Sequence, residues 1–158
     1  MLRRWARPKF GGMVTPMADA LSLARQVLAA QPFSALLGAE ITQFGQGQVE
    51  LRIAVTDKLR QQHGFVHGGV LSYAADNALT FAGGSALGPA AVTAEFKINY
   101  VRPALGELLI AKATVVYAGK RQAVCRCEVI SVSEGAESLC ALAQGTISAL
   151  SHGHNGAD

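Results

Sequence analysis

Residues 67–84 read HGGVLSYAADNALTFAGG, and this stretch decides the fold. Its apolar residues recur at the spacing of an α-helix, and many of them are alanines, which let neighbouring elements approach closely. The His67-Gly68-Gly69 run predicts the start of a long helix, and Gly83-Gly84 predicts its end. Because the apolar stripe is so broad, we expect this helix to be buried, with a sheet wrapped around it.

The segments on either side of this helix alternate between polar and apolar residues, with the period of two that is typical of β-strands. Strands are expected near residues 39–44, 48–56, 94–100, 108–117, 122–132 and 138–150, and an amphipathic helix over residues 17–30. In the 94–100 segment, Ala94, Phe96, Ile98 and Tyr100 are expected on one face and Glu95, Lys97 and Asn99 on the other. This order of elements predicts an α+β fold, with an antiparallel sheet around one buried helix.

The composition is that of a folded domain. Of the 158 residues, 50% are hydrophobic and 16% are charged, which excludes a disordered or linker protein. The length predicts one domain, and the mean hydropathy of +0.25 suggests that part of the surface is reserved for subunit contacts. The net charge is only +3 and no recognition motif is present, so no nucleic-acid partner is expected. The longest uncharged run, residues 77–94, is broken by glycines and Pro89, so no membrane association is expected either.

The chain has three cysteines, and an odd number favours a reducing compartment over a disulfide framework. The basic N-terminus is not followed by the apolar segment of a secretory signal, so we expect a cytoplasmic protein. Cys125 and Cys127 are two residues apart on one predicted strand and therefore lie on the same face, which is expected to point into the core. Because no cysteine or histidine spacing typical of a metal site accompanies them, no metal is expected.

Asp76 is a lone carboxylate in the middle of the apolar helix. Burial of an unpaired charge is costly, so Asp76 needs a polar partner, a wet cavity or an interface, unless it lies on a solvated face of the helix. Thr80 lies four residues later and therefore on the same face. At the start of the helix, the N–H of Gly68 has no partner within the helix and could hold an oxyanion, although a glycine-rich helix start without a ligand remains the alternative.

The spacing of these groups restricts how they could act together. Gly68 and Asp76 are eight residues apart, which corresponds to about 12 Å along a helix. Groups that act on one carbonyl must converge to about 3 Å from the reacting atoms. One helix therefore cannot present both groups to one substrate, whereas two antiparallel helices in a dimer can. If the protein is an enzyme, the site is predicted at a two-fold interface.

Residues 61–78 resemble the signature of the hotdog-fold acyl-CoA thioesterases, of which the PaaI-like and 4-hydroxybenzoyl-CoA groups are the most similar. Residues 92–104 resemble the strand that follows the helix in that family. The resemblance covers roughly residues 33–150, which we expect to form the hotdog domain. Residues 1–32 are then an N-terminal extension and helix, and residues 151–158 a flexible tail.

The resemblance implies a role for individual residues. The family's acid, which acts as general base or nucleophile, matches Asp76. The glycine whose N–H polarises the thioester carbonyl matches Gly68, and the amide side chain that positions the carbonyl or the water matches Gln61. Thr80 and His67 complete the predicted catalytic set. The residues predicted to bind substrate are Gly69, Thr93, Arg102, Lys120 and Arg121, the last three as cations for the phosphates of coenzyme A.

The implied activity is hydrolysis of an aryl or medium-chain acyl-CoA to the free acid and coenzyme A. No cofactor is required, because coenzyme A is part of the substrate. The family forms homodimers, often paired into homotetramers. Two alternatives stay open: a non-catalytic module that binds acyl-CoA, and a hotdog dehydratase or hydratase that acts on the acyl chain. The second is less favoured, because here the acid lies on the helix and two glycines follow the histidine.

Overall fold

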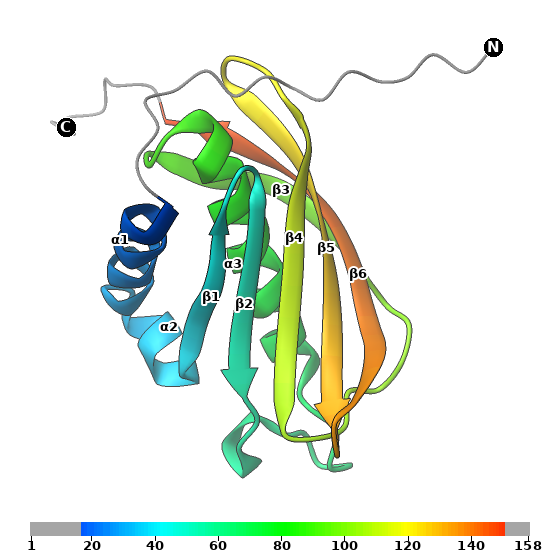
Figure 1. The fold of residues 1–158 in the computed structure, drawn as a ribbon. Coiled ribbons are helices and arrows are strands. Elements are labelled where there is room, and N and C mark those ends of the chain that lie inside the picture. Colours follow the sequence, from blue (N-terminus) through cyan, green and yellow to red (C-terminus); the bar gives the residue numbers. More distant parts are fainter. Residues whose placement is uncertain (1–16, 151–158) are drawn as a thin grey trace, which may run out of the picture.

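In the computed structural model, which describes residues 17–150, a curved sheet of six antiparallel strands wraps around the long helix α3 (Figure 1). The arginine-rich N-terminal segment and the predicted tail lie outside the described residues. The elements are α1 (Met17–Ala29), α2 (Pro32–Leu37), β1 (Ala39–Gly45), β2 (Gln48–Ala54), the short helix η1 (Asp57–Leu59), α3 (Gly68–Leu87), β3 (Ala91–Tyr100), β4 (Leu108–Ala118), β5 (Gln122–Ser133) and β6 (Ala136–Ala149). The prediction of an α+β hotdog fold is confirmed.

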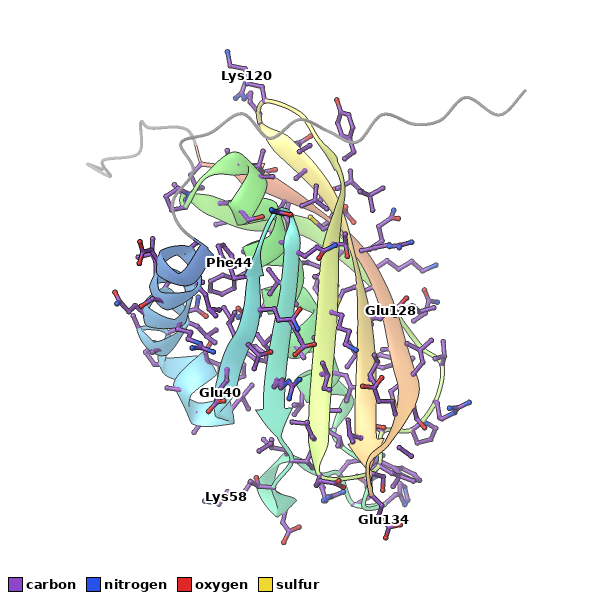
Figure 2. All side chains as sticks on the ribbon, in the orientation of Figure 1. Glu40, Phe44, Lys58, Lys120, Glu128 and Glu134 are labelled. Atoms are coloured by element: carbon purple, nitrogen blue, oxygen red, sulfur yellow. The ribbon has the colours of Figure 1, made fainter. Side chains whose placement is uncertain are left out.

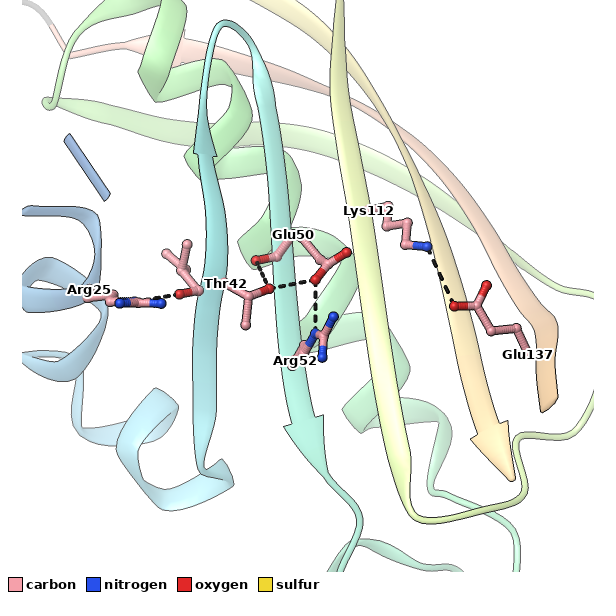
Figure 3. Close-up of polar contacts among 7 residues, drawn as sticks. Arg25, Thr42, Glu50, Arg52, Lys112 and Glu137 are labelled. Carbon is pink, nitrogen blue, oxygen red and sulfur yellow. Dashed lines mark hydrogen bonds and ion pairs between the residues drawn. The ribbon is translucent and has the colours of Figure 1, made fainter. Parts of the chain in front are cut away.

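The two edges of the sheet differ. The strand order is β1-β2-β4-β5-β6-β3, so β1 and β3 are the edge strands. Helix α1 packs against β1, where the Arg25 side chain donates a hydrogen bond of 2.8 Å to the carbonyl of Ile41 (Figure 3). Within residues 17–150 no element covers the outer edge of β3. Unpaired N–H and C=O groups along such an edge are a template for pairing with another chain.

The core lies between α3 and the inner face of the sheet. The helix contributes mostly small side chains there, with Ala74, Ala75, Ala78 and Ala82 fully buried. The sheet covers them with larger residues such as Leu51, Val129 and Ile147. Cys125 and Cys127 point into this core as predicted, and Cys140 is buried as well. No helix in the described part of the chain has the length and hydropathy needed to span a bilayer.

The predicted end of the central helix is wrong, because α3 continues past Gly83-Gly84 to Leu87. A Cβ atom at Gly83 would lie 2.5 Å from Cβ of Ile147 on β6. Glycine at this position permits close contact between helix and sheet and does not end the helix. The helix stops at Gly88, which has φ 107° and donates its N–H to the carbonyl of Gly84 at 2.8 Å.

The predicted facing of the β3 residues is correct from Glu95 to Tyr100 and wrong at Ala94. Phe96 and Ile98 pack against the core, but the pairing of β3 with β6 shifts register between Thr93 and Glu95. This bulge turns Thr93 toward α3 and leaves Ala94 exposed. Tyr100 lies on the same face as Phe96, as predicted, because its side chain contacts Gly68 of α3, although the residue is 54% exposed.

Candidate active site

The start of α3 presents one free backbone N–H. His67 caps the helix, and its Nδ1 accepts a hydrogen bond of 3.0 Å from the N–H of Gly69. The N–H of Gly68 has no acceptor among residues 17–150. Because the partial positive charge of a helix N-terminus adds to this free donor, Gly68 can stabilise a developing oxyanion. Of the two predicted glycines, Gly68 is therefore the one with an available donor.

A pocket of about 450 Å³ opens at this helix start. Its lining includes Gly68 together with two other predicted site residues, Gln61 and Arg102. The side-chain carbonyl of Gln61 accepts a hydrogen bond of 3.2 Å from the N–H of His63, which fixes it at the preceding turn. Tyr100, not predicted as a site residue, also lines the pocket and donates its hydroxyl to the carbonyl of Gly68 at 3.1 Å.

Asp76 lies in the middle of α3 and is half-buried. Its Oδ1 accepts a hydrogen bond of 2.7 Å from the hydroxyl of Thr93 on β3. The hydroxyl of Thr80 lies 2.8 Å from the backbone carbonyl of Asp76 and 2.6 Å from the hydroxyl of Thr93. Thr80 shares a face with Asp76 as predicted, but its hydroxyl turns back to the backbone, as threonine in a helix commonly does. The direct contact to the carboxylate comes from Thr93, which had been predicted to bind substrate.

The structure keeps the two chemical groups of α3 apart. Asp76 is not part of the pocket at Gly68, and the separation of eight positions corresponds to about 12 Å of helix. A carbonyl bound at Gly68 therefore lies beyond the reach of Asp76 in the same chain. Within one chain the two groups are therefore separated along the helix, as the helix spacing predicts.

The predicted cations also lie at two ends of the molecule. Lys120 and Arg121 form the turn between β4 and β5, beside a groove of about 580 Å³ that Ser148 and Ala149 also line. Figure 2 shows Lys120 at the top, whereas Lys58 and Glu134 mark the opposite end. Arg102 lines the pocket at Gly68. A single chain does not bring Arg102 together with the other two cations.

A second polar cluster lies on the outer face of the sheet (Figure 3). The Glu50 carboxylate, only 7% exposed as a residue, accepts hydrogen bonds from Thr42 at 2.6 Å and from Arg52 at 2.9 Å. Burial by itself would raise the pKa of Glu50, but these two hydrogen bonds and the charges of Arg52 and Lys112 outweigh it and lower the pKa. Every polar partner of this carboxylate comes from the sheet itself, so we assign the cluster to stability.

Cys125 and Cys127 do not supply a nucleophile. Burial raises the pKa of Cys125 to about 11. Burial, with a smaller contribution from Glu128, raises the pKa of Cys127 to about 12. At neutral pH both thiols stay protonated and unreactive. Among residues 17–150, no three histidine, cysteine or carboxylate side chains lie close enough together to hold a metal ion.

Comparison with known proteins supports the family resemblance. The family model described as the thioesterase superfamily matches residues 63–137. The acyl-coenzyme A thioesterase PaaI of Escherichia coli is 32% identical over 104 residues, which cover 65% of this chain and 74% of that protein. The 1,4-dihydroxy-2-naphthoyl-CoA hydrolase of Listeria monocytogenes is 26% identical over 70% of this chain and 89% of that protein.

The fold agrees with these matches. The crystal structure of a thioesterase family protein from Silicibacter pomeroyi superposes with a TM-score of 0.77 at 36% sequence identity, covering 80% of this chain and 95% of that chain. Sequence and structure thus point to the same group of proteins. The chain belongs to the thioesterase superfamily, as a PaaI-like protein with the hotdog fold.

Proposed function

We propose that the protein hydrolyses an acyl-CoA thioester to a carboxylic acid and coenzyme A. The observation that carries this proposal is the pair of groups on α3: a carboxylate at Asp76 held by a hydroxyl, and a free N–H at Gly68 in a pocket. These are the two groups that acyl transfer to water requires. The names of two relatives, an acyl-coenzyme A thioesterase and an acyl-CoA hydrolase, support the same reaction class.

The chemistry follows from the positions of these groups. The N–H of Gly68 stabilises the negative charge that develops on the thioester oxygen, and Gln61 orients that carbonyl. Asp76 either removes a proton from water, which then attacks the carbonyl carbon, or attacks that carbon itself before hydrolysis of the anhydride. In both routes a C–O bond forms, the C–S bond breaks and coenzyme A leaves as a thiol after protonation. The acyl group is proposed to be an aryl or medium-chain one.

The site is completed by a second subunit. The open edge of β3 offers its backbone groups to the β3 strand of another copy. Antiparallel pairing of two β3 strands would also turn the two α3 helices antiparallel, and Gly68 of one subunit would then approach Asp76 of the other. Such a dimer is self-complementary, as two-fold assemblies are. Further pairing of dimers into a homotetramer is proposed from the family resemblance alone.

The same arrangement accounts for the separated cations. In an antiparallel dimer, the β4–β5 turn of one subunit lies at the end where the second subunit has its Gly68 pocket. Lys120 and Arg121 of one chain would then join Arg102 of the other around the phosphates of coenzyme A. Arginine and lysine are the side chains that bind phosphate in proteins.

The test is release of free thiol from a panel of aryl-, short- and long-chain acyl-CoAs. Wild type is compared with Asp76→Asn and with Asp19→Asn, a matched change at an exposed carboxylate on α1. Folding and oligomeric state are measured for all three. We expect hydrolysis by wild type and Asp19→Asn, and a loss of at least a hundredfold in Asp76→Asn.

The other outcomes separate the alternatives. Undiminished hydrolysis by a folded Asp76→Asn protein would contradict the role of Asp76. Binding of acyl-CoA without turnover by wild type would favour the non-catalytic module. Addition of water to an enoyl-CoA, without thiol release, would favour the hydratase.

A further inference from the structure

Tyr100 makes two contacts with the residue that carries the free N–H. Its hydroxyl donates a hydrogen bond of 3.1 Å to the carbonyl of Gly68. Its ring lies along the same glycine, since a Cβ atom at Gly68 would lie 3.6 Å from Cζ of Tyr100. The Tyr100 side chain is 54% exposed and lines the pocket of about 450 Å³.

Gly68 needs such contacts to keep one orientation. Glycine has more backbone freedom than any other residue, and the first N–H groups of a helix have no partner within the helix. His67 holds the N–H of Gly69, and Tyr100 holds the carbonyl of Gly68. Both atoms belong to the peptide unit that joins the two glycines. The N–H of Gly68 belongs to the preceding unit and stays free to meet a ligand.

The sheet fixes the position of Tyr100. Tyr100 is the last residue of β3 and pairs with Ala141 on β6. The next residue, Val101, donates its N–H to the carbonyl of Cys140 at 2.9 Å. The hydroxyl of Tyr100 therefore holds the start of α3 at a defined place relative to the sheet.

We propose that Tyr100 is a positioning residue: its hydroxyl holds Gly68 in the orientation in which the free N–H meets the substrate carbonyl, and its ring forms the wall along which the thioester lies. The inference rests on the proposed thioesterase function. The hydroxyl acts through Gly68 and affects the rate, whereas the ring affects binding. The two contributions are thus separable in kcat and KM.

Two variants of Tyr100 and one control test this role. Tyr100→Phe keeps the ring and loses one neutral hydrogen bond, so kcat is expected to fall about five- to tenfold with KM for acyl-CoA unchanged. Tyr100→Leu also loses the ring, so KM rises as well. The control is Thr42→Val, which removes a hydroxyl bonded to Glu50 on the opposite face of the sheet and leaves kcat unchanged.

The orientation of Gly68 can be followed without turnover. In protein labelled with ¹⁵N-glycine, the amide signal of Gly68 is expected to shift in Tyr100→Phe, and the Gly69 N–H, which donates to Nδ1 of His67, is expected to exchange its hydrogen faster. Neither change is expected in Thr42→Val. Wild-type kcat in Tyr100→Phe, or an unchanged Gly68 amide, would overturn the inference. If wild type hydrolyses no acyl-CoA, the proposed function fails, and the Gly68 amide alone then decides whether Tyr100 positions this glycine.

Discussion

The hydroxyl of Thr93 donates a hydrogen bond of 2.7 Å to one carboxylate oxygen of Asp76, across the gap between β3 and α3. The hydroxyl of Thr80 lies 2.6 Å from the hydroxyl of Thr93. It can donate its proton either to Thr93 or to the backbone carbonyl of Asp76. The other carboxylate oxygen has no hydrogen-bond partner among residues 17–150. One oxygen of Asp76 is thus held in place, and the other is available to water or to a thioester.

We expect Thr93→Val to lower kcat about tenfold or more. Valine keeps the β-branched shape but cannot donate to the carboxylate, and a hydrogen bond to a charged group contributes about 1.5–3 kcal/mol. Steady-state kinetics on the best acyl-CoA substrate measures the effect. Thr146→Val, on the neighbouring strand β6, is the matched control and should keep wild-type kcat. Equal rates for the two variants would show that Thr93 does not orient Asp76.

Replacement of both Lys120 and Arg121 by alanine is expected to raise KM for acyl-CoA about tenfold and to leave KM for the corresponding acyl-pantetheine unchanged. Acyl-pantetheine lacks the nucleotide phosphates that these cations are proposed to bind. Lys112→Ala, on the outer face of the sheet, controls for loss of positive charge. An equal rise in KM for both substrates would exclude a phosphate-binding role for this turn.

Gly83→Ala is expected to destabilise the protein by about 1–3 kcal/mol, because the new methyl group overlaps Ile147 and forces the helix away from the sheet. Gly84→Ala is the matched control, since a Cβ atom there would have Ala91 at 3.9 Å as its nearest neighbour. Alanine is the better helix former, so this control should be neutral or stabilising by up to about 1 kcal/mol. Denaturant unfolding measures both. Equal stability of the two variants would contradict the close packing of α3 on β6.

Glu50 is expected to stabilise the protein at neutral pH and to lose this effect in acid. Its pKa in the folded protein is lowered from the ordinary value of 4.5, so the unfolded chain takes up the proton first as the pH falls. The stabilisation is present above that ordinary value and is lost as the pH falls through the lower folded-state pKa. The difference in unfolding free energy between wild type and Glu50→Gln should therefore shrink in this acidic window. A difference in unfolding free energy that does not vary with pH would contradict the lowered pKa of Glu50. The control is Glu134→Gln, at an exposed turn.

Much of the fold and part of the site could be predicted from the sequence. Strand periodicity and the apolar helix give the order of elements, because burial on one face imposes a regular pattern. Asp76 and Gly68 stand out because a charge in an apolar helix and glycines at a helix start both break that pattern. Gln61 and Arg102, two residues that the sequence also singles out, line the pocket at Gly68.

The remaining features depend on contacts that local sequence does not encode. Gly83 predicts a helix end that the structure does not have, because a glycine that ends a helix and one that admits a neighbouring strand look alike in sequence. The bulge between Thr93 and Glu95 leaves no clear pattern, so the contact of Thr93 with Asp76 could not be predicted. The available signal for Tyr100 was its position: it is an aromatic residue two positions before Arg102, which is a predicted site residue.

The central claim is that Asp76 of one subunit and Gly68 of another act on the same thioester, and mixed dimers test it most directly. Asp76→Asn removes the carboxylate. Gly68→Ala places a methyl group beside the free N–H at an ordinary contact distance from Tyr100, so it should fold normally. The N–H remains in Gly68→Ala, but the methyl group enters the pocket and is expected to keep the substrate carbonyl away from it, so each variant alone should be inactive.

The two variants are differently tagged, unfolded together and refolded. Random pairing gives half mixed dimers, and each mixed dimer has one site with both groups intact. The account predicts that the mixture recovers about a quarter of wild-type activity, all of it in the fraction that carries both tags. Inactive mixed dimers would contradict a site shared between subunits.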